Sequence, residues 1–212
     1  MSDVVHMSVF LQDIRDCGTF HRVHRHFYPD RSPALTLTGF NEVGHRGTLI
    51  EVEPTAVKRE EAFAIEHVDW PEHRPFAGPA AVRAGPLCFF AGVLGLNAAG
   101  RLVTGPDDLD DDLGRRVASD LARYESSRGF AAQCWAAWRL LERVCVKSGV
   151  TLDQLAKTTV YVRTCSDIWI YEEIREAILP GHRTPAIEFV CIQSPGPVAS
   201  AHVQIEALAS VD

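Results

Sequence analysis

Residues 154–167 read Gln154-Leu-Ala-Lys-Thr-Thr-Val-Tyr-Val-Arg-Thr-Cys-Ser-Asp167, and a related stretch near the start of the chain reads Asp3-Val-Val-His-Met-Ser-Val-Phe-Leu-Gln-Asp-Ile-Arg-Asp16. Two more pairs follow in the same order: Arg31-Ser-Pro-Ala34 with Arg183-Thr-Pro-Ala186, and Ile50-Glu-Val-Glu53 with Val203-Gln-Ile-Glu206. We interpret an internal repeat before other features of a sequence, because the repeat determines the architecture. The repeat predicts one complete unit preceded by the back half of another.

Composition narrows the class of protein. The chain has 212 residues and a formal net charge of −7, which argues against a nucleic-acid-binding surface. No apolar run approaches the ~18 residues that a membrane-spanning helix needs. Much of the negative charge lies in Asp107-Asp-Leu-Asp-Asp-Asp112, which is more typical of a solvated loop than of a metal site.

The cysteines and histidines form no metal-binding pattern. Six cysteines are scattered without a C-x-x-C pair, and most stand in apolar runs, so we expect reduced, buried thiols and a cytoplasmic protein. His21, His24 and His26 have no cysteine or carboxylate at ligand spacing, and we expect them at the surface. No metal and no cofactor are predicted.

Hydrophobic periodicity predicts the elements. Residues 1–57 form a β-α-β-β half-unit, with a strand at 4–12, a helix at 16–28 and strands at 35–38 and 48–53. Residues 58–75 look like a linker with one strand between 62 and 68. The complete unit, 76–212, is expected to have strands and helices at the following positions: strands 80–83, 87–94, 155–163, 186–192 and 201–209, and helices 113–124, 130–147 and 167–179.

Several of these stretches resemble the Rid family, also called YjgF/RidA or endoribonuclease L-PSP. Residues 81–92, Ala81-Val-Arg-Ala-Gly-Pro-Leu-Cys-Phe-Phe-Ala-Gly92, are similar to the opening hairpin of that family. Residues 131–149 resemble its first helix, Leu155-Ala-Lys-Thr-Thr-Val-Tyr-Val162 its central strand, and Gln204-Ile-Glu-Ala-Leu-Ala209 its last strand. The resemblance covers about 76–212 as a whole unit and 3–57 as a half-unit.

The resemblance implies an α+β protein of the Rid/YjgF (chorismate-mutase-like) fold. In this fold a mixed six-stranded sheet is backed by two helices, and subunits assemble as a homotrimer with ligand clefts between them. Members with the full site hydrolyse reactive imines and enamines to keto acids and ammonia, without a metal or bound cofactor. An arginine binds the substrate carboxylate, and a glutamate positions the attacking water.

The expected site is altered in this chain. The family's arginine follows a Pro-Ala pair, but here Ile187 follows Pro185-Ala186, and Arg183 stands four residues earlier, about 13 Å along an extended chain. Gln204 occupies the position of the glutamate, while Glu206 lies two residues later on the same face of the strand. We therefore predict Arg183, Gln204 and Glu206 as catalytic candidates, with a charge at a subunit interface as the alternative for Glu206.

Five further residues are candidates for substrate binding. His202 is expected to share a face with Gln204 and Glu206, although a buried, hydrogen-bonded structural histidine is the slightly favoured alternative. The others are drawn from the opening hairpin, the helix at 167–179 and the strand at 186–192: Ala91, Glu172, Ile187 and Glu188.

Three functions remain open at this point. The first is a divergent imine or enamine hydrolase, the second a regulatory trimer that binds a small carboxylated metabolite without turnover, and the third a chorismatase-like enzyme acting on another carboxylated substrate. The half-unit either docks on the complete unit or marks a shortened form of a longer tandem protein, because its sheet edge and apolar helix face need a cover.

Overall fold

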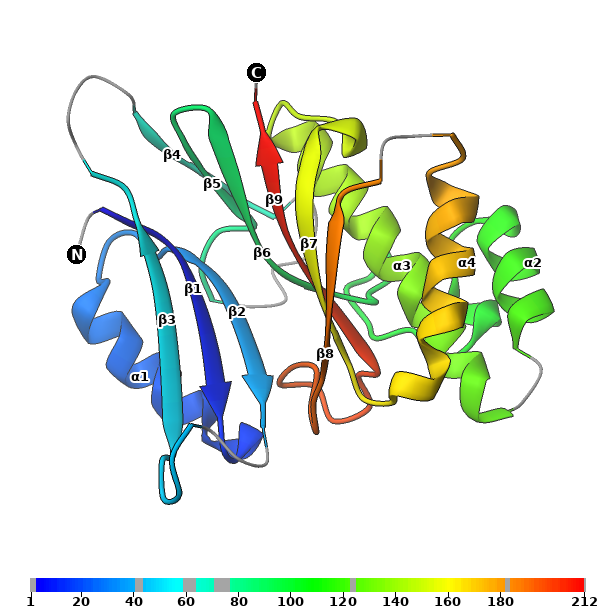
Figure 1. Cartoon of the computed structure of the whole chain (residues 1–212), viewed down its shortest axis with the longest axis horizontal. Coiled ribbons are helices and arrows are strands. Elements are labelled where there is room, and N and C mark those ends of the chain that lie inside the picture. The colour runs from blue at the N-terminus through cyan, green and yellow to red at the C-terminus, as the bar shows by residue number, and fades with distance from the viewer. Residues whose placement is uncertain are drawn as a thin grey trace.

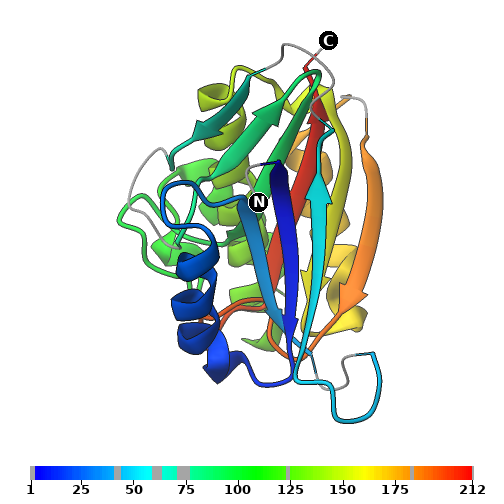
Figure 2. The ribbon, with the colours of Figure 1, turned by 90° about the vertical axis from the view of Figure 1, so that its left-hand side faces the viewer.

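The structure is a computed structural model that describes residues 3–40, 44–58, 64–70, 77–122, 125–181 and 184–211. A sheet of six strands and a sheet of three strands pack against each other through their inner faces (Figures 1 and 2). Helices α3 and α4 cover the outer face of the larger sheet, α2 packs on the far side of these two helices, and α1 covers the outer face of the smaller sheet (Figure 1).

The larger sheet has the strand order β4-β5-β6-β9-β7-β8 and is mixed, as predicted. Its central strand β7 pairs in parallel with β8 and antiparallel with β9. The bounds of the strands are β4 Ile65–Val68, β5 Ala81–Ala84, β6 Leu87–Leu94, β7 Leu155–Val162, β8 Ala186–Cys191 and β9 Val203–Ser210. β4 lies inside the range expected to be a linker and completes the six strands by pairing with β5.

The smaller sheet consists of β2 (Ala34–Gly39), β1 (Val4–Leu11) and β3 (Ile50–Ala56), and α1 (Cys17–Phe27) connects β1 to β2. β1 pairs in parallel with β2 and antiparallel with β3, which is the pairing that β7 makes with β8 and β9. The element order β1-α1-β2-β3 is therefore the same as β7-α4-β8-β9. That this half-unit is a truncated copy of the larger unit stays a prediction.

Three helices accompany the larger sheet, one more than the two expected from the resemblance. They are α2 (Asp112–Leu121), α3 (Glu125–Lys147) and α4 (Ile168–Ile178). Trp135 and Trp138 of α3 are buried in the core. Gly149 follows α3 with a φ of 72°, the left-handed conformation expected of a helix C-cap. In the described part of the chain, no helix has the length and apolar character required to cross a membrane.

Alternation along β1 determines how the two sheets meet. Met7, Val9 and Leu11 point toward α1 and form a small core beneath it. The residues that alternate with them, among them His6 and Phe10, face the larger sheet. The ring of Phe10 lies 6.2 Å from that of Tyr161, and the ring of His6 lies 6.5 Å from that of Phe89. Successive side chains of a strand point to opposite faces, so one strand serves both layers.

The acidic run is solvated, as expected, since four of its five aspartates are exposed, and three of its carboxylates also accept backbone hydrogen bonds. Asp108 accepts from the amide and hydroxyl of Thr104, at 2.8 and 2.6 Å, and these bonds lower the pKa of Asp108. Asp111 caps α2 by accepting from the amide of Gly114 at 2.7 Å, and it also accepts from the indole of Trp135 at 2.9 Å. The run thus anchors α2 to α3.

The cysteines divide into two groups. Cys88, Cys134 and Cys145 are buried thiols, as expected, and burial raises the pKa of each. The expectation fails for Cys165 and Cys191, which form an exposed disulfide with their Cα atoms 6.0 Å apart. The fold brings the turn after β7 next to the end of the parallel strand β8, and this proximity is not visible in the sequence spacing.

His24 is buried, contrary to the expected surface position of the α1 histidines. It is 5% exposed, its ring stacks on Tyr28 at 4.7 Å, and its Nε2 has no hydrogen-bond partner among the described residues. Burial, followed by the charge of His21, lowers the pKa of His24 to about 4. The buried position of His24 therefore favours the neutral imidazole over the charged one.

Acid should accordingly destabilise the fold through His24. Its pKa of about 4 lies below the ordinary 6.5, so the unfolded chain binds more protons between these values, and stability falls as the pH drops from about 6.5 toward 4. His24→Phe should reduce the loss of thermal stability between pH 7 and pH 4.5, measured as Tm. His26→Phe, at an exposed position of the same helix, is the control. Equal pH dependence in wild type and His24→Phe would contradict this assignment.

Candidate functional site

A cavity of about 190 Å³ lies between the two sheets. The smaller sheet contributes His6 of β1 and Thr55 of β3 to its wall. The larger sheet contributes the remaining lining residues from β6, β7 and β9, which are Phe89, Lys157, Thr159, Glu206, Ala207 and Leu208. All of these residues belong to one chain, and the cleft between subunits that the resemblance implies stays a prediction.

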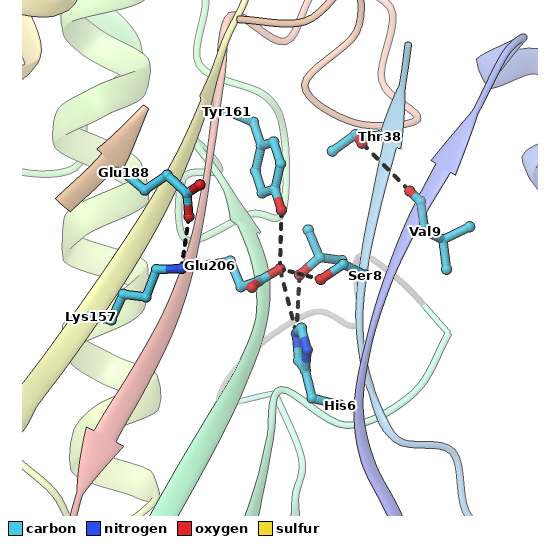
Figure 3. Close-up of polar contacts among 9 residues, drawn as sticks. His6, Ser8, Val9, Thr38, Lys157, Tyr161, Glu188 and Glu206 are labelled. Carbon is cyan, nitrogen blue, oxygen red and sulfur yellow. Dashed lines mark hydrogen bonds and ion pairs between the residues drawn. The ribbon is translucent and has the colours of Figure 1, made fainter. Parts of the chain in front are cut away.

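Glu206 is the centre of a polar cluster on this wall (Figure 3). Its Oε2 accepts a hydrogen bond from Ser8 Oγ at 3.0 Å and a longer one from the Tyr161 hydroxyl at 3.5 Å. His6 Nε2 lies 3.5 Å from the same oxygen. Thr36 Oγ1 lies 3.4 Å from His6 Nε2 and extends the cluster to β2. One carboxylate oxygen thus faces polar groups from both sheets.

Burial determines the charge of the groups around Glu206. Burial lowers the pKa of His6, and the nearby carboxylate of Glu206 opposes this effect. Burial also raises the pKa of Tyr161 well above its usual range, and the negative charge of Glu206 raises it further. We therefore expect a neutral imidazole and a neutral phenol beside Glu206 near pH 7, which can accept and donate hydrogen bonds without adding charge.

Aligned positions of the two repeats face each other across the cavity. His6 of β1 corresponds to Lys157 of β7, since the repeats are offset by 151 residues in these strands, and both residues line the wall. The same offset relates Ser8 to Thr159. The two sheets therefore contact each other through the faces of β1 and β7 that the predicted repeat aligns.

Sequence reasoning missed His6 and Ser8. Their signal was available, because both alternate with the apolar residues of β1 and stand at repeat positions equivalent to residues of β7. The signal was not specific enough, since Ser8 and Glu206 are separated by 198 residues in the sequence.

Of the three predicted catalytic residues, the structure describes Glu206 and Gln204 and places them in different surroundings. Glu206 lies in the polar cluster. Gln204 lies on the same face of β9 but is 2% exposed, and its Oε1 has no hydrogen-bond partner among the described residues. A Cβ atom on Gly92 would come within 2.6 Å of the Gln204 amide group, so only glycine leaves room for this side chain. Arg183 lies outside the described residues.

The structure places most of the substrate-binding candidates away from the cavity. Glu172 lies on α4, across the larger sheet from the cavity, and pairs with Arg175 at 2.8 Å. Ile187 packs against the core beneath the helices, and Ala91 is buried at the irregularity of β6. Glu188 alone among these four lies near the cavity, because it pairs with Lys157.

His202 does not join Gln204 and Glu206 in one stripe. It precedes β9, and its ring lies near Gly129 of α3, on the helical side of the sheet. Its backbone amide donates to Gln133 Oε1 at 2.7 Å, and burial lowers its pKa. The alternation that we extended to position 202 begins only at Val203, so the structural alternative for His202 describes it better.

The described side chains do not suggest a metal centre. Among them, no group of three or more histidine, cysteine, aspartate or glutamate side chains is arranged to hold a metal ion. The chemistry that this cavity can support with its own groups is acid–base chemistry at Glu206, His6 and Tyr161, next to an apolar wall of Phe89 and Leu208.

Comparison with solved structures identifies the fold. A Klebsiella pneumoniae protein, described provisionally as an endoribonuclease, superposes over 63% of this chain and all of its own length, with a TM-score of 0.56 at 21% identity. Yeast YEO7 matches 70% of this chain and all of its own, with a TM-score of 0.54 at 14% identity. The Yersinia pestis Rid-family protein YyfA does likewise, with a TM-score of 0.51 at 18% identity.

These likenesses establish the fold, and about a third of this chain lies outside each of them. No protein-family model matches the sequence, and no curated protein matches it at a significant level.

Proposed function

Because the chain has the Rid/YjgF fold, we propose that it hydrolyses small imines or enamines that carry a carboxylate, releasing a keto acid and ammonia. The observation that carries this proposal is the Glu206 cluster, in which a carboxylate, an imidazole and a phenol meet on the wall of one cavity. Positioned acid–base groups of this kind typically accelerate proton transfers by about 10²–10⁴-fold.

The residues of the cluster have the following roles in the proposed reaction. An enamine first takes a proton on its methylene carbon and becomes an imine. Water then adds to the imine carbon while Glu206 accepts a proton from it, which gives a carbinolamine. Glu206 returns this proton to the nitrogen, and as the C–N bond breaks and ammonia leaves, the hydroxyl oxygen forms the keto group and loses its proton to solvent. Ser8 donates to Glu206 and holds the carboxylate in place. His6 and Tyr161 lie close enough to Glu206 to exchange protons with it.

The size and polarity of the cavity support a small substrate. A volume of about 190 Å³ suits a molecule of a few carbon atoms, and Phe89, Ala207 and Leu208 offer it an apolar surface. Ribonuclease activity is not part of the proposal, because a net charge of −7 disfavours the binding of a polyanion. A homotrimeric assembly stays a proposal from the resemblance.

Ammonia release tests the proposed function. The protein should accelerate ammonia formation from freshly generated 2-aminoacrylate, followed by a coupled assay against the spontaneous rate. His6→Gln should reduce this acceleration if the smaller sheet contributes to the site. If the protein gives no acceleration while keto acids raise its Tm, the regulatory binding function is supported and the hydrolase proposal is wrong.

A further inference from the structure

Lys157 and Glu188 form an ion pair beside the cavity. Lys157 lines the cavity from β7, and its Nζ lies 2.7 Å from Oε2 of Glu188 on the neighbouring strand β8 (Figure 3). The side chains are 50% and 54% exposed, so the pair lies where the cavity meets solvent. Exposed ion pairs of this kind contribute little to stability, and either partner can be exchanged for another ion.

The strand register places a second carboxylate near the same lysine. Thr159 of β7 pairs with Glu188 on β8 and with Glu206 on β9, so the two carboxylates flank one threonine. Lys157 stands two residues from Thr159, on the same face of β7. Among the described lining residues the ionisable side chains are His6, Lys157 and Glu206. With His6 neutral, Lys157 is the positive charge that this wall offers to an anion.

We propose that Lys157 is the anchor for the carboxylate of the ligand and that Glu188 is a built-in counter-ion, which an entering carboxylate displaces. This inference rests on the proposed function only for the location of the site. In the empty site Glu188 holds the lysine at the rim. In the occupied site the ligand carboxylate takes the place of Glu188, while Glu206 remains free for acid–base chemistry.

The same charges determine the class of ligand. A ligand with one carboxylate and a short apolar chain places its charge at Lys157 and its chain against Phe89 and Leu208. A dicarboxylate brings its second charge toward Glu206 or Glu188, and like charges at this distance repel. The site should therefore bind pyruvate or 2-oxobutanoate in preference to 2-oxoglutarate.

Calorimetric titration of the whole chain with pyruvate tests the anchor without requiring turnover. Lys157→Met should weaken binding by at least about tenfold, the loss expected for a charge-assisted hydrogen bond, and Lys157→Arg should retain most of the affinity. Glu188→Gln should tighten binding by about two- to fivefold, because the competing carboxylate is removed. Glu173→Gln makes the same charge change at an exposed position of α4 and should leave the affinity unchanged.

The outcomes separate the anchor from the proposed function. Wild-type affinity in Lys157→Met, or absence of pyruvate binding to every variant, overturns the anchor. Equal tightening in Glu188→Gln and Glu173→Gln also overturns the role of Glu188, because net charge alone would then explain both. If pyruvate binds through Lys157 but 2-aminoacrylate is not turned over, the anchor holds and the hydrolase proposal fails.

Discussion

Glu206→Gln should lower the rate of ammonia release from 2-aminoacrylate by about 10²–10⁴-fold, the contribution expected of a positioned acid–base group. The amide keeps the shape of the carboxylate and can still accept a hydrogen bond from Ser8, so the cavity should stay intact. It cannot take a proton from water. The loss should therefore appear mainly in kcat, with little change in KM. Initial rates over a range of substrate concentrations provide the measurement.

Two comparisons make this result specific to Glu206. Glu173→Gln changes the charge of the chain by the same amount at a remote, exposed position and should keep the wild-type rate. Thermal unfolding of Glu206→Gln should remain close to wild type, which separates a catalytic defect from a folding defect. A rate within threefold of wild type in Glu206→Gln would show that this carboxylate is not the base.

Gln133→Leu should reduce the free energy of unfolding by about 2–5 kcal/mol, because its amide satisfies three backbone groups. Gln133 Nε2 donates to the carbonyls of Val103 and Ser200, both at 3.0 Å, and its Oε1 accepts from the amide of His202 at 2.7 Å. The side chain is 1% exposed, so leucine leaves these partners with poor access to water. Urea denaturation followed by circular dichroism measures the loss.

The same substitution reaches the site, because Gln133 holds the segment that leads into β9. Ser200 and His202 immediately precede the strand that carries Gln204 and Glu206. Gln12→Leu replaces an exposed glutamine and should change the free energy of unfolding by less than about 0.5 kcal/mol. If the two leucine variants were equally stable, the three hydrogen bonds of Gln133 would not stabilise the fold.

The position of the smaller sheet suggests that this sheet contributes residues to the proposed site. It supplies His6, Ser8 and Thr55 to a site whose carboxylate comes from the larger sheet. These residues occupy the inner face of the smaller sheet, while its outer face packs on α1. A half-unit that only completed the architecture would not need polar groups on its inner face, and we therefore regard this sheet as part of the proposed site.

Local sequence patterns were sufficient for most of the fold. Alternation in 4–12 and 155–163 and the apolar face of 130–147 correctly predicted two strands and a helix, because each depends on residues that are neighbours in the chain. The order of motifs along residues 81–209 was sufficient to identify the Rid/YjgF fold. Glu206 was found as a candidate because it occupies a recognisable position in one of these motifs.

Tertiary packing alone decided the composition of the site. Alternation shows that His6 and Ser8 share a face, but not that this face meets Glu206, which is 198 residues from Ser8 in the sequence. It also could not show that Glu188 pairs with Lys157, or that Ile187 and Glu172 belong to the helical side. A strand's period determines which side chains point together. Which surface they then meet depends on the packing of whole sheets, a property of the complete fold.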